Sequence, residues 1–371
     1  MKILESASET LLRLEKRWGI PLTGLAIGVV LFLAATVLVA PRLTTVGGAG
    51  LSPEFQNLSE EPFNFSRNSP LQYRILTPLL AHVLMLRGRL YPVFPLLIGV
   101  ALLATVYVHF RKSSSPMTSA AAAAMMAFSM PLLSSFFCAG YPDAVSYLLI
   151  WICLTATSLP LQCTAFALML LNHESTAFAF PFLAYRPWNQ EPIRKTVLRA
   201  VLLLAMFIPL VAYRKYVDLH SAPLLGAGYY LNVAAIADNV KKVAHFAALG
   251  LFEAFRLFWY VVLFALLVLV RSRKIGEAAW LILVVGCACL PLVLACDTGR
   301  FTALAFPAVL LSIKVLGSHF DKATLEKSLW LLFAANFFVP VYFTWERQSA
   351  FLLPWPILFL LKLVGMDGWK I

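Results

Sequence analysis

Charged side chains are scarce in this sequence. Only 13% of its 371 residues are Asp, Glu, Lys or Arg, whereas 61% are hydrophobic. Soluble domains have about 25% charged and about 45–50% apolar residues, so this composition excludes an ordinary soluble protein. It indicates an all-α polytopic membrane protein, whose apolar helices cross the bilayer several times.

Several signatures of nucleotide and protease chemistry are also missing. The chain contains no G-x-x-x-x-G-K-[ST] phosphate loop and neither a G-x-S-x-G nor a G-x-G-D motif. Their absence argues against a Walker-type enzyme and against intramembrane proteolysis. The six cysteines lie mostly in apolar runs, and the C-x-C pair Cys287 and Cys289 lacks the second pair that a metal site needs. We assign the cysteines no chemistry.

The N-terminus lacks the features of a cleavable signal peptide. Acidic and basic residues alternate in MKILESASETLLRLEKRWGI, and no small-residue cleavage site follows. We interpret residues 1–19 as a cytoplasmic amphipathic helix that leads into the first span. The net charge of +12 indicates basic cytoplasmic loops rather than nucleic-acid binding, because no basic-aromatic motif accompanies it.

About twelve apolar runs predict a single transmembrane domain over residues 1–371. The runs are 20–40, 91–110, 117–137, 143–158, 160–172, 174–186, 197–213, 247–270, 277–296, 301–315, 329–344 and 350–365. Several are shorter than the ~20 residues of a usual span, and the segment 143–186 could hold three short helices or one span with a re-entrant pair. Residues 70–86 predict an interfacial amphipathic helix, with a true span as the alternative.

The basic residues orient these spans. With a cytoplasmic N-terminus and no crossing at 70–86, most of the 30 Lys and Arg residues fall on the cytoplasmic side, including the clusters LRLEKR and RSRK. We therefore predict a protein of the cytoplasmic (inner or plasma) membrane. Its outer loops are predicted at 41–90, which contains the interfacial helix, and at 214–246.

Four polar clusters fall on the outer side in this topology. They are PFNFSRNSPLQYR at 62–74, YPDA at 141–144, NHES at 172–175 and DTGR at 297–300. Charges at membrane depth are costly unless they face water, a partner or a substrate. Their position on one side therefore indicates a site that opens outward.

Each cluster also has a purely structural interpretation. Asp143 could cap the helix that follows it. Asp297 could pair with Arg300 across a Gly-containing turn, and Glu174 could be bonded to His173 or to a neighbouring helix.

Arg74 is harder to explain by structure alone. Its predicted helix is apolar, and its guanidinium matches the geometry of a phosphate. Arginines beside carboxylates suit transfer from a lipid phosphate, because the arginines stabilise the leaving phosphate and a carboxylate takes the proton of the attacking hydroxyl.

Together these features resemble the GT-C superfamily, membrane glycosyltransferases that take sugars from polyprenyl-phosphate-linked donors. The resemblance lies in a first span, a long outer loop with acids and a jaw-like interfacial helix, and many spans of unequal length. The stretch PFNFSRNSPLQYRILTPLLA resembles a Pro-Phe…Tyr-Arg-x-Leu-x-Pro pattern of bacterial members, and YPDA, NHES and DTGRFTALAFP follow in the same order.

The resemblance implies that an acidic residue is the catalytic base. In the family it is an Asp or Glu soon after the first span, for which Glu54 is the nearest match, with Glu60 and Glu61 as alternatives. The usual acid close to the span end is missing, so Asp143 could take the role, and Glu174 is a third catalytic candidate.

The resemblance further implies which residues bind substrate and what the substrates are. The implied substrate-binding residues are Arg74, Arg300, Asp297, His173, Tyr229 and Tyr230. The two arginines would hold the lipid phosphate, and the tyrosines would form either a sugar platform or part of the interfacial aromatic belt. We expect a polyprenyl-phosphate-linked sugar donor, a lipid or glycan acceptor, contact with membrane lipids and no nucleic acid. No cofactor is required, although the acids would tolerate a divalent cation.

Other functional classes stay open at this point. Short broken helices and paired intramembrane charges also suit a secondary transporter, although the two halves share no convincing repeat. The missing base motif would suit a non-catalytic subunit of an envelope glycan or lipid pathway. His173 at membrane depth would suit a lipid acyltransferase.

Overall fold

The structure, a computed structural model, describes residues 2–38, 52–67, 70–187, 191–221, 232–294, 297–345, 348–353 and 355–364. The regular secondary structure of these residues is helical apart from one short hairpin, as the composition predicts. The α-helices of the first half are α1 (Lys2–Leu38), α2 (Ser52–Glu60), α3 (Leu76–Val83), α4 (Val93–Arg111), α5 (Pro116–Ala127), α6 (Met130–Phe137), α7 (Asp143–Thr155), α8 (Leu159–Asn172) and α9 (Phe180–Ala184). Those of the second half are α10 (Ile193–Ala205), α11 (Phe207–His220), α13 (Val233–Ala244), α14 (Ala247–Phe255), α15 (Trp259–Arg271), α16 (Ile275–Cys289), α17 (Thr298–Thr302), α18 (Phe306–Gly317), α19 (Lys322–Phe337) and α20 (Trp355–Leu363). Short 3-10 helices include η3 (Pro70–Tyr73), η5 (Glu174–Ala179) and η8 (Leu290–Val293).

Six helical segments in the described residues are long and apolar enough to cross a membrane. They are Leu4–Leu38, Gly88–Arg111, Ile193–His220, Ala247–Arg271, Ile275–Val293 and Thr298–Gly317, and each overlaps a run predicted from the sequence. Helices α5 and α6 form a seventh candidate, a broken pair bent by 45°. These segments support an integral membrane protein, but they do not confirm the predicted number of about twelve spans.

The surface of α10 and α11 is consistent with a lipid environment. Large apolar side chains are exposed along both helices, among them Val201, Leu204, Ile208 and Val211. A continuous apolar surface of this kind is unusual on a soluble monomer and typical of a surface that another apolar phase covers.

Several of the remaining predicted spans are too short to cross. Helices α7 and α8 have 13 and 14 residues, or about 20 Å each at 1.5 Å per residue, whereas a bilayer core is about 30 Å thick. The run 174–186 forms only η5 and the five-residue α9. Helix α3 has eight residues, which excludes the alternative of a true span at 70–86.

The end of the predicted run 329–344 and the start of the run 350–365 form strands and not helices. Strand β1 (Val341–Trp345) pairs antiparallel with β2 (Gln348–Leu352), so that Val341 lies opposite Leu352. The sequence VYFTW is rich in aromatic and β-branched residues, which favour strands, and Pro340 just before it cannot continue a helix.

Helix α1 consists of two parts that meet at Gly19. This residue has φ 78° and ψ 161°, a backbone conformation that favours glycine, and it ends the N-terminal segment that we interpret as amphipathic. Beyond the kink, α1 packs on α4 through Gly24 and Gly28. A Cβ atom at Gly28 would lie 2.8 Å from the carbonyl oxygen of Val100, so glycine permits the close approach of the two helices.

Helix α5 lies at the centre of the core. All 12 of its residues, PMTSAAAAAMMA, are buried, and it packs against α1, α4 and α19. The Ser115 hydroxyl accepts a hydrogen bond from the Thr118 N–H at 3.1 Å, and Pro116 occupies the first turn, so the helix start is well defined. Its alanines allow the neighbouring backbones to come close together.

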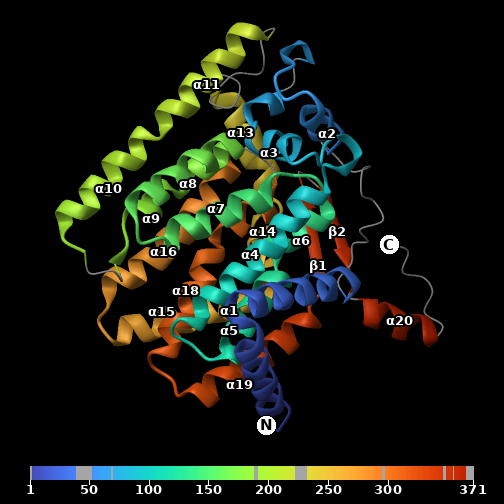
Figure 1. The fold of residues 1–371 in the computed structure, drawn as a ribbon, viewed down its shortest axis with the longest axis vertical. Helices are drawn as coiled ribbons and strands as arrows, with labels where there is room; N and C mark the ends of the chain where they lie inside the picture. The colour runs from blue at the N-terminus through green and yellow to red at the C-terminus, as the bar shows by residue number, and fades with distance from the viewer. Residues whose placement is uncertain are drawn as a thin grey trace.

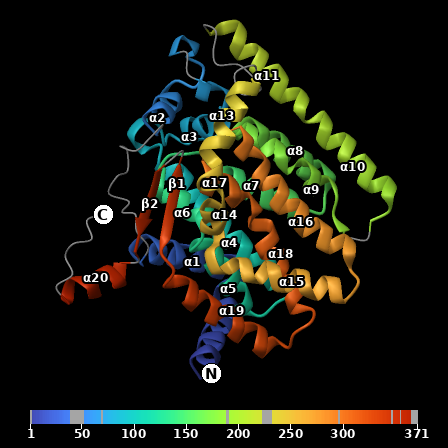
Figure 2. The ribbon, with the colours of Figure 1, turned by 180° about the vertical axis from the view of Figure 1, so that it is seen from behind.

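Several helices connect two ends of the molecule (Figures 1 and 2). Helices α2, α3 and α13 lie together at one end, and α5, α15 and α18 lie toward the other. Helix α7 begins near α2 and α3, because Val145 belongs to the same buried cluster as Phe55 and Leu76. It ends at Thr155, which lines a cavity together with residues from the ends of α15 and α18.

Candidate functional site

Six of the predicted site residues come together at the α2–α3 end. Arg74 lies just before α3, Asp143 is the first residue of α7, His173 and Glu174 lie at the junction of α8 and η5, and Asp297 and Arg300 lie at the start of α17. We call these six residues the arginine cluster.

Arg300 is the most enclosed charge of the arginine cluster. Its Nε and Nη2 donate to the two oxygens of Asp143 over 2.6 and 3.0 Å, and its Nη1 donates to Asp297. The guanidinium also lies over the ring of Tyr141, with Cζ 4.3 Å from the ring centroid. Because the side chains of Arg300 and Asp143 are only 8% and 10% exposed, each provides the counter-charge that burial of the other requires.

The alternative role of Asp143 as a helix cap is wrong. Pro142 occupies the cap position of α7, and no side chain donates or accepts a capping bond there. The alternative interpretation of Asp297, an ion pair with Arg300 across the turn, is confirmed.

Arg74 and Glu174 form a second pair nearer the surface. The Nε and Nη2 of Arg74 donate to Glu174 over 3.1 and 2.8 Å, and the two side chains are 15% and 32% exposed. Within the described part of the chain, Nη1 of Arg74 makes no hydrogen bond. Glu174 is thus bonded to the segment before α3, as one of its structural interpretations expects. His173 Nδ1 lies 3.9 Å from the Glu174 carboxylate.

The two pairs belong to one electrostatic unit. Asp143 interacts with His173 and Arg74 in addition to Arg300, and Asp297 interacts with Arg74 and Asp143. Asp297 also has a buried oxygen, Oδ1, that makes no hydrogen bond within the residues that the structure describes. An incoming group bound to Arg74 would therefore lie within the field of the Asp297 carboxylate.

Burial and neighbouring charges shift the pKa values of Glu174, Asp297 and His173 in different directions. Burial raises the pKa of Glu174, but the charge of Arg74 more than compensates and the net pKa is far below its usual range. Burial also raises the pKa of Asp297, and Arg300 opposes this rise without cancelling it. The pKa of His173 falls to about 4, mainly through burial and further through Arg74, so the ring is neutral at pH 7. Carboxylates whose pKa values are pushed apart are typical of sites that separate acid and base roles.

Asn172 holds the cluster's supporting helices together. Its Nδ2 donates to the Pro142 carbonyl at 2.8 Å and to the Ser146 hydroxyl at 2.9 Å, and its Oδ1 accepts a hydrogen bond from Thr77. It thereby connects α3, α7 and α8. The residue belongs to the NHES motif, but its role could not be predicted because the helices that it joins are distant in sequence.

Aromatic side chains place α2 beside the cluster. The ring of Phe55 lies 5.7 Å from that of Tyr141 and 6.2 Å from that of Tyr91. The hydroxyl of Tyr91 is buried, makes no hydrogen bond within the described residues and interacts electrostatically with Asp143. Glu54 precedes Phe55 on α2 and is half-buried.

The other predicted residues contribute less to this geometry. Glu60 ends α2 beside Gly88, and Glu61 accepts a hydrogen bond from the Asn64 amide at 2.6 Å. Tyr229 and Tyr230 lie outside the described residues, so their role stays a prediction. The described part of the predicted outer loop 214–246 is largely helical, because α11 continues to His220 and α13 follows.

The described residues contain no group of candidate metal ligands, and comparisons with known proteins identify no relative. In the described ranges, no group of three or more His, Cys, Asp and Glu side chains is placed to hold a metal ion. No protein-family model, curated protein or solved structure matches the chain. The functional conclusion therefore depends on the residues of the arginine cluster.

Proposed function

We propose that this chain is a membrane glycosyltransferase of GT-C type. It would move a sugar from a polyprenyl-phosphate donor to a lipid or glycan acceptor at the outer face of the cytoplasmic membrane. The proposal rests on the arginine cluster, in which Arg74 and Asp297 interact electrostatically. A guanidinium with an uncommitted Nη1 lies in the same cluster as a carboxylate with an uncommitted Oδ1.

The proposed reaction uses these two groups in sequence. Arg74 binds the donor phosphate, and Asp297 accepts the proton of the acceptor hydroxyl, whose oxygen attacks the anomeric carbon of the sugar. The bond between that carbon and the phosphate oxygen breaks, and the polyprenyl phosphate leaves with the electron pair while Arg74 stabilises its charge. Asp297 suits proton acceptance better than Glu174, because burial raises its pKa while Arg74 depresses that of Glu174.

The other acids of the cluster have positioning roles in this proposal. Asp143 holds Arg300 through two hydrogen bonds, and Glu174 holds Arg74 in the same way. A phosphate bound to the uncommitted Nη1 of Arg74 would lie beside the Glu174 carboxylate. Glu54, on the adjacent α2, is the second candidate for the base.

Turnover measurements test the proposal and separate the two bases. The purified protein in nanodiscs would be given polyprenyl-phosphate hexoses and pentoses with a lipid acceptor extract. We expect Arg74→Gln and Asp297→Asn to lower turnover by about 10²-fold or more, as loss of a general base commonly does. The exposed Arg87→Gln is the matched control. Full activity in Asp297→Asn together with loss in Glu54→Gln would transfer the base role to Glu54, and full activity in Arg74→Gln would refute the phosphate role.

The distribution of lysines supports an arginine cluster that faces the outer side of the membrane. Lys112, Lys274 and Lys314 lie at the end of the molecule opposite the arginine cluster, where the positive-inside rule expects the cytoplasm. A cysteine at the exposed Ser66 should react with an impermeant maleimide in intact cells, and one at the exposed Ser272 should not. The reverse labelling would place the arginine cluster on the cytoplasmic side.

One observation favours a secondary transporter as the second candidate. Helices α5 and α6 form a broken pair, and transporters place substrate sites at such breaks. The charges of the arginine cluster, however, come from other segments. Solute flux driven by an ion gradient and lost in Glu174→Gln, with no sugar transfer by the wild type, would favour the transporter.

A further inference from the structure

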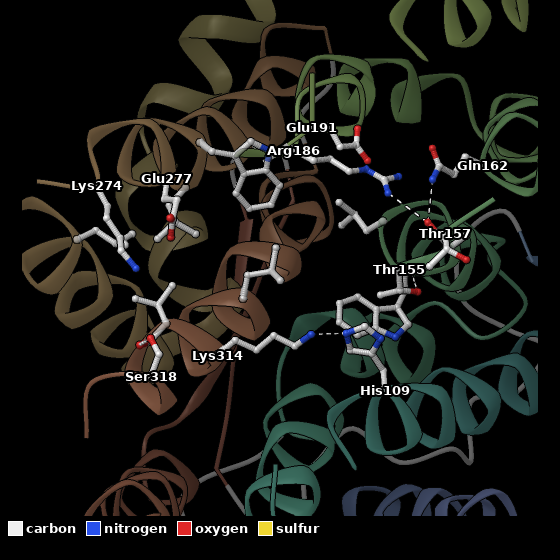
Figure 3. Close-up of a pocket in the computed structure, with 18 of the residues that line it drawn as sticks. His109, Thr155, Thr157, Gln162, Arg186, Glu191, Lys274, Glu277, Lys314 and Ser318 are labelled. Atoms are coloured by element: carbon white, nitrogen blue, oxygen red, sulfur yellow. Dashed lines mark hydrogen bonds between the residues drawn. The ribbon is translucent and has the colours of Figure 1, made fainter. Parts of the chain in front are cut away.

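A second polar site lies at the other end of α7 (Figure 3). A cavity of about 540 Å³ is lined by the end of α7, the ends of α4, α15 and α18, and the start of α16. Because α7 has 13 residues, it separates this cavity from the arginine cluster by about 20 Å. The volume falls within the range of small-molecule sites. We call this cavity the basic pocket, after its residues Arg186, Lys274 and Lys314.

Arg186 is a buried cation whose hydrogen bonds go to neutral groups. The residue is only 4% exposed. Its Nη1 donates to the Ala156 carbonyl at 3.3 Å, and its Nη2 donates to the Cys153 carbonyl. Its Nε makes no hydrogen bond within the described residues. Two acids, Glu191 and Glu277, also line the pocket. Glu191 interacts electrostatically with Arg186, but its carboxylate is bound directly by Arg199.

Lys314 is a second cation without a counter-charge. Its ammonium group is hydrogen-bonded to Nε2 of His109. An ammonium group can only donate, so this nitrogen accepts and the imidazole is neutral. In the described part of the chain, no carboxylate lies within 4.0 Å of the Lys314 ammonium.

The walls of the basic pocket add a free donor and apolar surface. The indole N–H of Trp151 is buried and has no partner in the described residues. Trp280 and Leu281 line the same cavity, while the Trp280 indole N–H is already used by the Phe182 carbonyl at 3.0 Å. The pocket thus combines an excess of basic over acidic side chains with apolar aromatic surface.

Lys314 is an enclosed cation with no carboxylate bonded to it in the described residues, which is unfavourable unless an anion completes the site. We propose that the basic pocket binds a phosphate ester, with its phosphate at Lys314 and its organic part against Trp151 and Trp280. A phosphate monoester carries nearly two negative charges at pH 7, which balances the three basic residues of the lining, set against Glu277 and the Arg199-bound Glu191, better than a carboxylate does. The same chemistry is offered by a soluble phosphate ester and by the headgroup of a phosphatidic-acid-type lipid.

Binding measurements with matched probes test this proposal. The apparent melting temperature of the full-length protein in neutral detergent would be titrated with glycerol 3-phosphate, and with glycerol as the uncharged control. In parallel, protein in phosphatidylcholine nanodiscs would be compared with nanodiscs that also contain phosphatidic acid. The variants are Lys314→Gln, Lys274→Gln at the exposed rim, and Arg271→Gln, an exposed basic residue of the same turn that does not line the pocket.

Each outcome has a defined meaning. We expect a saturable rise in melting temperature with a phosphate probe, an affinity at least about tenfold lower in Lys314→Gln, a smaller loss in Lys274→Gln and none in Arg271→Gln. A response to glycerol 3-phosphate identifies a soluble ester, and a response to phosphatidic acid alone identifies a lipid headgroup. No response to either probe, or equal responses in Lys314→Gln and Arg271→Gln, would overturn the proposal.

Discussion

The buried cations at the two ends of this molecule have different hydrogen-bond partners. In the arginine cluster, both Arg74 and Arg300 hold a carboxylate through two hydrogen bonds. In the basic pocket, Arg186 donates to backbone carbonyls and Lys314 to a neutral imidazole. At the first end both arginines bond carboxylates, whereas at the second end Glu191 is bound by Arg199 and, among the described residues, neither Arg186 nor Lys314 bonds a carboxylate.

This difference separates the two kinds of site that a buried cation can form. A cation already paired with a carboxylate keeps that acid close to any anion that it binds. That arrangement suits chemistry, in which a phosphate leaves and an acid handles a proton. An unpaired cation suits binding, because the ligand itself supplies the missing charge.

The largest expected effect is the loss of the deepest ion pair. Asp143→Ala leaves the guanidinium of Arg300 with a single, more exposed acid, and breaking a buried pair from one side costs about 3–5 kcal/mol. We expect a marked fall in apparent melting temperature and in the monodisperse fraction on size exclusion. Asp238→Ala, which removes an exposed i,i+4 pair with Lys242, should change stability by less than about 1 kcal/mol. Equal stability of the two variants would show that Arg300 does not depend on Asp143.

The burial of His173 should make the stability of the protein depend on pH. Its folded pKa of about 4 lies below the unfolded value of about 6.5, so the unfolded state binds more protons between these values and stability falls as pH drops from 6.5 to 4. The loss is about 3 kcal/mol by pH 4 and is absent at pH 7. Melting curves at fixed scan rate should show a shallower acid slope in His173→Gln. The exposed His220→Gln is the control and should keep the wild-type slope, and an unchanged slope in His173→Gln would contradict the burial of a neutral ring.

The smallest effect is expected at the basic pocket. Lys314→Gln removes a cation that faces no carboxylate, so without added phosphate it should leave stability unchanged or raise it by up to about 1 kcal/mol. Melting temperatures in phosphate-free buffer provide the measurement. A fall as large as that of Asp143→Ala would show that Lys314 has an internal counter-charge after all, and the contrast between the two ends would disappear.

The sequence predicts the members of the arginine cluster better than it predicts their pairing. Charged residues in an apolar chain stand out, so Arg74, Glu174 and Arg300 could be selected from composition alone. Which acid meets which arginine depends on how α3, α7 and α17 pack, and no local pattern encodes that packing. Asp143 illustrates this limit, because its position after Pro142 suggests a helix cap while the fold directs its carboxylate to Arg300.

The basic pocket and the hairpin show what the sequence could not reveal. Lys314 and Arg186 look like ordinary cytoplasmic anchors in sequence, since their lack of counter-charge appears only when the ends of several helices meet. The hairpin interrupts two apolar runs whose composition suits helix and strand alike. Six spans, in contrast, followed directly from long apolar runs, because length and hydropathy are local properties.

Native mass spectrometry in mild detergent tests whether the arginine cluster binds a lipid phosphate. We predict that a polyprenyl phosphate or its glycosylated form remains bound to the wild type, is lost in Arg74→Gln and is retained in Lys314→Gln. Retention of the same lipid in Arg74→Gln, or the presence of bulk phospholipid alone in all three proteins, would contradict the assignment of the arginine cluster as a lipid-phosphate transferase site.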